Sequence, residues 1–339
     1  EQEWPSTNIR DYDLFLKDRQ LTREPGPDEA ATQHVQSPAH IGQFAGKWCS
    51  YSATPDLPGD QRDEDGGSLI FETEPLPDTL EILGMVKVDL RLAANQPVAM
   101  AVARISDVAP DGKATRVTYG VLNLTHRNSH ENPEPLEKDA AYTVRLELNE
   151  VAQSFPRGHR IRLSISTSYW PLLWLPPRPV MMTIWPSECR VVLPVRTPRS
   201  EDEHLRQFPE AEGAPPLEVS RLTAEEANWR MIRDMETKTN ILEVIKDDGA
   251  RRIEEIDMVI QNRTVERYSV QGDNFSSAKG ETLWTRSFSR EGWQVQTRTK
   301  TVLTCDQENF YIRAELDAFE DERRVYSQNW DTVIERRLV

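Results

Sequence analysis

Glycine is scarce in this chain, with only 15 among 339 residues, so glycine-based catalytic motifs can be checked one by one. The only two glycines four residues apart, Gly42 and Gly46, enclose Gln43-Phe44-Ala45, so the chain has no GxSxG nucleophile elbow. No glycine spacing fits the dinucleotide fingerprint or the phosphate-binding loop. We therefore predict a chain that has no catalytic residue of its own and no cofactor.

Cysteines and long apolar runs are also few. Cys49, Cys189 and Cys305 are odd in number and far apart, which favours reduced thiols in a cytoplasmic protein over a disulfide framework. No segment approaches the roughly 20 apolar residues that span a bilayer. The first residues, from Glu1 to Pro5, show neither the basic region nor the apolar core of a secretion signal. We expect a soluble, cytoplasmic protein.

Positive charge is outnumbered, with 41 Lys and Arg against 56 Asp and Glu, a net charge of -15 and a pI near 5.0. Such a chain repels phosphate backbones and anionic lipid heads at long range. We therefore expect neither a nucleic-acid partner nor a membrane partner. Self-association into a homo-oligomer stays open.

Two segments resemble metal sites but lack essential parts. His126 and His130 would share one face only in a helix, and the prolines that follow and the strand pattern that precedes them oppose a helix. Segment 61–66 places Asp63 and Asp65 at calcium-loop positions, yet glutamine replaces the first carboxylate and a strand pattern follows. We predict loop histidines, a solvated acidic loop and no metal site.

Strand signals dominate the chain. Strict alternation runs over 142–149, where apolar residues at even positions are separated by polar ones, and the same period recurs over 86–92, 161–165 and 310–316. Strands that are apolar on one face only are typical of antiparallel sheets. The sequence therefore predicts an all-β fold.

Helical signals are scarce. The best candidate runs from Thr223 to Arg233, where Thr223 and Glu226 have the spacing of a capping box. This spacing is common in sequences, so its occurrence by chance is the alternative interpretation.

A linker is predicted over 199–216, because this stretch combines charges, Gly213 and Pro215-Pro216 with no sustained apolar period. It divides the chain into an N-terminal connecting segment (1–30), a first β domain (31–198) and a second β-rich domain (217–339).

Several short segments follow one another in a distinctive order. They are Trp4-Pro5, Asp60-Gln61-Arg62, 68–71, Leu83-Gly84, 103–112, 119–127, 155–163 and 166–171. In this order and spacing they resemble the C-terminal region of the serine peptidase family that includes X-Pro dipeptidyl-peptidases, cocaine esterase and α-amino-acid ester hydrolases. Residues 217–339 resemble the extra β domain that a subset of the family carries, through Gly292-Trp293, Phe310 and 314–316.

The resemblance implies a fold and a function. The fold would be a jelly-roll (galactose-binding-like) β-sandwich followed by a second, mainly antiparallel β domain. In the family a Ser-Asp-His triad lies on an α/β-hydrolase domain that precedes the sandwich, so none of its members maps onto this chain. We expect a non-catalytic part whose partner is its own α/β-hydrolase domain, outside the given residues. The alternative is a free-standing β-sandwich that binds a ligand such as a carbohydrate.

The aromatic loop 169–177 is the most unusual local composition, since it concentrates aromatic residues and prolines. Its residues Tyr169, Trp170 and Trp174 are our candidates for contact with the hydrolase domain or for the rim of its substrate pocket, because large aromatics supply contact area at a low cost in rotamer entropy. The alternative is that the loop folds into the core of the sandwich.

Overall fold

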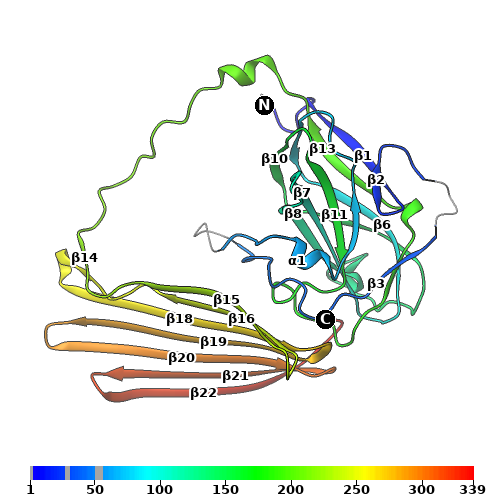
Figure 1. Ribbon diagram of the computed structural model, residues 1–339. Coiled ribbons are helices and arrows are strands. Elements are labelled where there is room, and N and C mark those ends of the chain that lie inside the picture. Colours follow the sequence, from blue (N-terminus) through cyan, green and yellow to red (C-terminus); the bar gives the residue numbers. More distant parts are fainter. Residues whose placement is uncertain (1–2, 27–30, 50–55) are drawn as a thin grey trace. The chain divides into compact units, whose positions relative to one another are not determined.

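The computed structural model describes residues 3–26, 31–49 and 56–339. The chain divides into two compact units, Glu1–Arg206 with Leu338–Val339, and Gln207–Arg337 (Figure 1). The predicted all-β fold, a jelly-roll sandwich followed by a second antiparallel β domain, is confirmed, since both units are built from strands that pair mainly antiparallel. Among the described residues, no helix is long and apolar enough to cross a membrane.

The first unit holds a 13-stranded sheet among its described residues. Its strands are β1 (Ile9–Lys17), β2 (Gln20–Thr22), β3 (Gln33–Val35), β4 (Leu69–Glu72), β5 (Leu80–Gly84), β6 (Lys87–Ala94), β7 (Met100–Val108), β8 (Ala114–Asn123), β9 (Tyr142–Glu147), β10 (Val151–Phe155), β11 (Arg160–Ser166), β12 (Met182–Ile184) and β13 (Arg190–Arg196). Its short helices are α1 (Arg62–Asp65), η1 (Leu124–His126), η2 (Pro186–Glu188) and η3 (Ser200–His204). The hydrogen-bonded order is β3-β12-β6-β13-β1-β2-β4-β11-β7-β8, with β9 on β6 and with β5 between β10 and β13.

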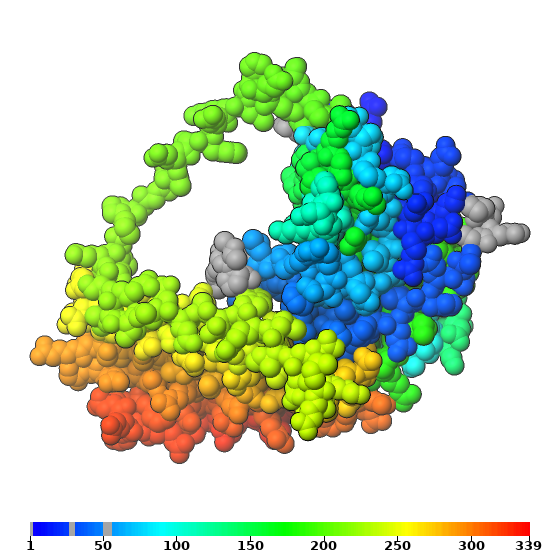
Figure 2. All heavy atoms as spheres, in the orientation of Figure 1, coloured from blue at the N-terminus to red at the C-terminus, as the bar shows by residue number. Residues whose placement is uncertain are grey.

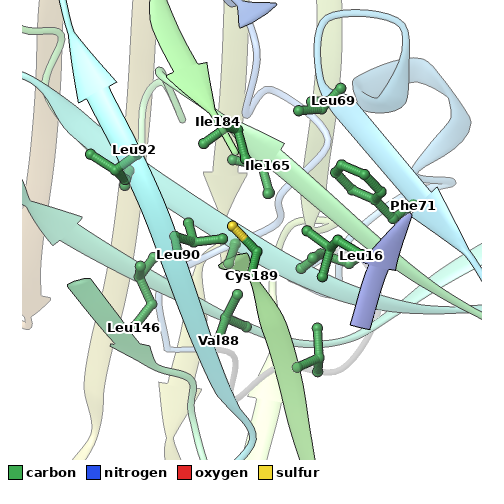
Figure 3. Packing of buried hydrophobic residues seen from close by; sticks show 14 of the residues in the cluster. Leu16, Leu69, Phe71, Val88, Leu90, Leu92, Leu146, Ile165, Ile184 and Cys189 are labelled. Atoms are coloured by element: carbon green, nitrogen blue, oxygen red, sulfur yellow. The ribbon is translucent and has the colours of Figure 1, made fainter. Parts of the chain in front are cut away.

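The core of the first unit forms because alternate side chains of its strands point inward. In β6, Val88, Leu90 and Leu92 are fully buried. Across the ladder Val88 pairs with Leu146 on β9 (Figure 3). Leu90 pairs with Val144 on the same strand. Burying each side chain of this kind stabilises the fold by about 1.5–3 kcal/mol. The alternation predicted for β9 is confirmed, since its polar positions are exposed.

The N-terminal segment differs from the predicted connection over 1–30, because β1 and β2 belong to the sheet. Strand β1 pairs with β13 from Ile9 opposite Arg196 to Phe15 opposite Arg190. Leu14 and Leu16, 3% and 0% exposed, point into the core. This apolar alternation is short, and Phe15 lies between its two members, so the strand signal is weak in the sequence.

The predicted helix from Thr223 to Arg233 is wrong. Strand β15 (Glu226–Asp234) pairs along its whole length with β16 (Thr239–Asp247). The Thr223 hydroxyl accepts a hydrogen bond from the backbone N–H of Ala250 at 2.7 Å and so bridges to another segment instead of capping a helix. Cross-strand pairing overrides a weak local propensity here.

The second unit is a single nine-stranded sheet. Besides β15 and β16 it contains β14 (Val219–Arg221), β17 (Arg251–Ile253), β18 (Met258–Gln271), β19 (Asn274–Arg290), β20 (Trp293–Cys305), β21 (Asn309–Glu320), β22 (Arg323–Glu335) and the turn η4 (Glu254–Ile256). The strands from β18 to β22 follow one another in the sheet as they do in the sequence, and β16 lies between β15 and β18. Every pairing in this sheet is antiparallel.

The two units meet in sequence between Arg206 and Gln207, inside the stretch where we place a linker. From residue 207 to 218 every side chain is exposed, and Phe208 is 99% exposed. Figure 2 shows this light green segment as a single extended thread. Nothing in its sequence offers a strand partner or a core face.

Candidate functional site

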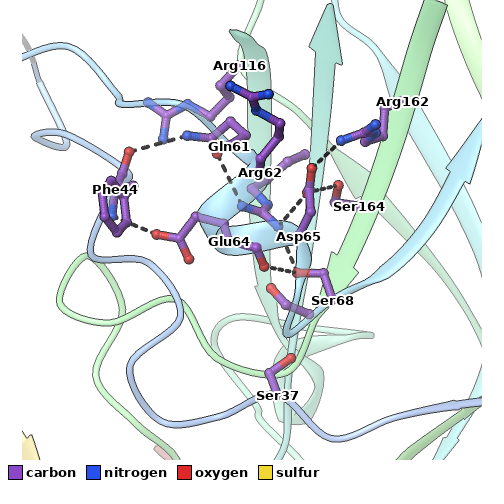
Figure 4. Close-up of polar contacts among 12 residues, drawn as sticks. Ser37, Phe44, Gln61, Arg62, Glu64, Asp65, Ser68, Arg116, Arg162 and Ser164 are labelled. Carbon is purple, nitrogen blue, oxygen red and sulfur yellow. Dashed lines mark hydrogen bonds and ion pairs between the residues drawn. The ribbon is translucent and has the colours of Figure 1, made fainter. Parts of the chain in front are cut away.

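Helix α1 carries two buried carboxylates of the first unit. It is a single turn, yet its Glu64 and Asp65 are only 1% and 5% exposed. Glu64 accepts a hydrogen bond of 2.6 Å from the backbone N–H of Phe44 (Figure 4). It accepts a second one, also of 2.6 Å, from the backbone N–H of Gly42. Burial raises the pKa of Glu64, while the charge of Arg104 and these two amides oppose that rise. The carboxylate thus satisfies loop amides that no strand ladder pairs.

Asp65 connects α1 to the sheet. Its carboxylate accepts hydrogen bonds from Nη1 of Arg162 at 2.5 Å and from Oγ of Ser164 at 2.7 Å, both on β11 (Figure 4). Arg162 also donates to Glu72 on the adjacent β4, at 2.8 Å. One helical turn is therefore tied to two neighbouring strands.

Arg104, on β7, is the central cation of this cluster, and its side chain is fully buried. It donates to Oε1 of Gln61 at 3.1 Å and to Oγ of Ser68 at 2.7 Å, and its Nη2 lies 3.5 Å from Oδ1 of Asp65. The planar guanidinium suits this fan of acceptors, and such contacts offset the cost of removing a charge from water. We call Gln61, Glu64, Asp65, Arg104 and Arg162 the α1 network.

Gly42 joins the α1 network to the aromatic loop 169–177. Its φ is +114°, and a Cβ on this residue would lie 2.4 Å from the carbonyl carbon of Tyr169. The next peptide adds a direct link, since the N–H of Trp170 donates to the carbonyl of Ile41 at 2.6 Å. Only glycine combines this backbone conformation with so close an approach.

The predicted contact residues fall into two groups. Tyr169 and Trp170 are fully buried, and Oη of Tyr169 accepts a hydrogen bond from Nη1 of Arg116 at 2.7 Å. Trp174 is partly exposed and packs edge-on against Trp170, with ring centroids 4.8 Å apart. Tyr169 and Trp170 are thus part of the interior of the first unit. The contact role stays a prediction for Trp174, which reaches the surface.

The two segments that resemble metal sites in the sequence differ in how deeply the structure buries their side chains. The Nδ1 atoms of His126, in η1, and of His130 lie 3.3 Å apart, and His126 is half-buried while His130 is exposed. The expectation of a solvated acidic loop holds for Asp63, which is exposed, and is wrong for Asp65, which the α1 network buries. In the described part of the chain, no three His, Cys, Asp or Glu side chains come together as metal ligands would.

A shallow pocket of about 550 Å³ opens elsewhere on the first unit, beside Phe15 and Asp89. Asp89 accepts hydrogen bonds from Arg145 at 2.6 and 2.9 Å and from Arg190 at 2.9 Å. These bonds, with Arg145 the larger influence, hold the pKa of Asp89 below its ordinary value. Burial raises the pKa of the Cys189 thiol, also in this pocket, to about 12, so the thiol stays protonated near neutral pH and is a poor nucleophile.

Comparison with known families identifies the family of the first unit. The family described as the X-Pro dipeptidyl-peptidase C-terminal non-catalytic domain matches residues 1–201. The chain therefore belongs to this family, as the order of its segments indicates. The matched region ends before the second unit begins.

Individual relatives agree with this assignment. Cocaine esterase of Rhodococcus sp. is 29% identical over 146 residues, which cover 42% of this chain and 25% of that protein. A putative serine esterase of Mycobacterium bovis is 24% identical over 192 residues, which cover 48% of this chain and 29% of that protein. The chain thus spans less than a third of the length of either relative.

A solved structure shows a similar fold. The crystal structure of an aminopeptidase from a marine sediment archaeon, Thaumarchaeota archaeon, matches with a TM-score of 0.51 at 21% identity. The match covers 57% of this chain and 38% of that one.

The α1 network is the feature that sequence reasoning missed. The strand signal in 100–108 is a run of small and apolar residues interrupted by Arg104. An arginine in the middle of a fully buried strand needs a buried acceptor, and the acidic segment just before β4 could supply one. The position of Arg104 within an apolar strand therefore indicates the network in the sequence itself. The contact of Gly42 with the backbone of Tyr169 has no such signal, because these residues are more than a hundred positions apart.

Replacing Gly42 by alanine tests the close approach. We expect Gly158→Ala, at φ +83° with open space around it, to lose about 1–2 kcal/mol from backbone strain alone. Gly42→Ala should lose a further ~1–3 kcal/mol because the methyl group displaces the backbone of Tyr169. Urea unfolding of both variants measures the difference, and equal losses would contradict the proposed contact.

Replacing Arg104 by leucine tests the α1 network. Removal of one partner from a buried ionic cluster should lower the free energy of unfolding by ~3 kcal/mol. The matched control is Arg145→Leu, which removes a half-exposed arginine from its pair with Asp89 and should cost less than ~1 kcal/mol. Thermal and urea unfolding give both values. A control that loses as much as the Arg104 variant would show that burial does not govern the effect.

Proposed function

We propose that this chain is the non-catalytic part of an X-Pro dipeptidyl-peptidase-like serine hydrolase, and that its sandwich supports an α/β-hydrolase domain or rims its substrate pocket. The observation that carries the proposal is the match of residues 1–201 to a domain described as non-catalytic. The lack of a GxSxG motif in the sequence agrees with it.

The geometry of the first unit suits a supporting role. The α1 network fixes one loop and, through Gly42, the aromatic loop 169–177. Trp174 therefore stands at the surface on a base that buried contacts hold in place. An aromatic side chain on a rigid base loses little entropy when a second domain or a substrate covers it. The nucleophilic serine, the acyl-enzyme and the oxyanion hole would belong to the hydrolase domain.

The location we propose is cytoplasmic. In the described part of the chain, Cys49, Cys189 and Cys305 form no disulfide. Free thiols are usual where the compartment is reducing.

Activity assays test the proposal. The 339-residue chain should not hydrolyse p-nitrophenyl esters or X-Pro anilides, and a fluorophosphonate probe should not label it. The same sequence joined to the hydrolase domain expected upstream of it should do both, with labelling lost when the serine of GxSxG is changed to alanine. Stoichiometric labelling of the isolated chain would overturn the proposal.

The pocket beside Asp89 favours a second candidate, a carbohydrate-binding module. Its volume lies within the range of small-ligand sites, and it combines the aromatic ring of Phe15 with charged groups. For a carbohydrate-binding module we expect saturable binding in a glycan screen. Phe15→Ala and Arg145→Ala should abolish this binding, and Trp174→Ala should leave it unchanged. A screen with no hit would remove this candidate.

A further inference from the structure

The sheet of the second unit has two chemically different faces. Residues paired across neighbouring antiparallel strands project to the same face, so the pairing register assigns every residue to one side. One cross-strand row runs Trp229, Val244, Glu266, Thr282, Thr301, Ala314 and Trp330. The adjacent row, displaced by one residue, runs Arg230, Glu243, Arg267, Glu281, Val302, Arg313 and Asp331. We call the side of the first row the aromatic face and that of the second row the charged face.

All four tryptophans of the second unit lie on the aromatic face. Trp284 belongs to the row next to that of Trp229 and Trp330, two residues along β19, and Trp293 pairs with Arg290 on the same side. Phe288, Leu316 and Tyr326 extend the same face. Such a concentration of large side chains is typical of a surface that another layer covers.

The charged face carries ion pairs beside exposed aliphatic side chains such as Leu283 and Val333, and it has no tryptophan. Glu243 lies 2.7 Å from both Arg230 and Arg267, and these arginines hold the pKa of Glu243 below its ordinary value, with Arg267 the larger influence. Arg313 and Asp331 are 3.3 Å apart on the outer strands. This face is therefore compatible with water.

On the aromatic face, Leu242 and Val244 of β16 are buried, whereas the large rings of β19 and β22 are open. Trp284 is 45% exposed, Trp330 46% and Tyr326 50%. The unit consists of one sheet and one short turn, so it has no second sheet or helix of its own to lie over these rings. Soluble proteins rarely expose apolar patches larger than a few hundred Å² unless a partner covers them.

We propose that the aromatic face is a homodimer interface, on which the same face of a second copy of this chain packs as the other layer of a sandwich. Seven long strands, from β15 to β22 without β17, are spaced ~4.8 Å apart and pair with their neighbours over about 11 residues, which gives a face of about 1,200 Å². Two such faces bury on the order of 2,400 Å² together, as obligate homodimers do. Facing sheets of a sandwich lie ~10 Å apart, which interdigitated aromatic side chains fill.

The boundary of the family match favours a second copy over a hydrolase domain as the occupant. The region that this chain shares with its family ends at residue 201, before the sheet begins. The sheet therefore lies outside the region that defines the family. A twofold dimer also needs only one self-complementary surface, and this inference does not depend on the proposed function.

A neighbouring pair of residues supplies the test. Trp284 lies on the aromatic face and Leu283 on the charged face of the same strand, with similar exposures of 45% and 38%. Sedimentation velocity of the 339-residue chain should give a dimer of 39.0 kDa subunits. Trp284→Glu should weaken dimerisation on the order of 100-fold, because a central aromatic anchor is replaced by a charge. Leu283→Glu should leave the dimer intact.

A second pair of variants, on β22, tests the interface even if Trp284→Glu does not fold. Trp330→Glu and Val333→Glu lie on opposite faces of the edge strand β22, at 46% and 58% exposure, and circular dichroism confirms that each variant folds. Dissociation by the Trp330 variant alone supports the proposal. A monomeric wild-type chain overturns it, whether the face then binds an apolar ligand or the hydrolase domain. So does a dimer that both aromatic-face variants leave unchanged.

Discussion

A carboxylate cluster buried under a loop is the constraint on which the sandwich of this chain depends. Glu64 and Asp65 lie on one helical turn, and each binds a different part of the fold, Glu64 the loop amides and Asp65 the sheet. Arg104 supplies the positive charge between them, and without it the low-dielectric interior would make both carboxylates costly. Because Gly42 also touches the aromatic loop, the same contacts fix the surface on which Trp174 stands.

The sequence predicts most of the fold, since period-two alternation survives in strands such as β9, where one face is buried and the other exposed. It fails where the apolar alternation covers only part of a strand, as with Leu14 and Leu16 in β1, and where a local capping pattern competes with long-range pairing, as in β15. Of the candidate site, Trp174 reaches the surface while Tyr169 and Trp170 do not, because burial of an aromatic residue depends on contacts that sequence spacing does not encode.

The two units solve the burial problem differently. In the first, strands distant in sequence enclose one core, and the few charges inside are matched by partners. In the second, one sheet separates its chemistry by face, so that arginines and acids pair on one side and rings gather on the other. The family match covers only the first unit, so the surface of the second unit is the evidence for its role.

The pairing of β1 with β13 has a consequence for how the chain folds during synthesis. Ile9 finds its partner only when Arg196 has been made, so the first sheet stays open until nearly two hundred residues are available. From β18 to β22, each strand instead pairs with the one made just before it. Non-local closure is slow and local pairing fast. During synthesis the first unit therefore folds slowly, whereas strands β18 to β22 pair quickly as each is made. The nascent first unit thus has the greater need of chaperone protection.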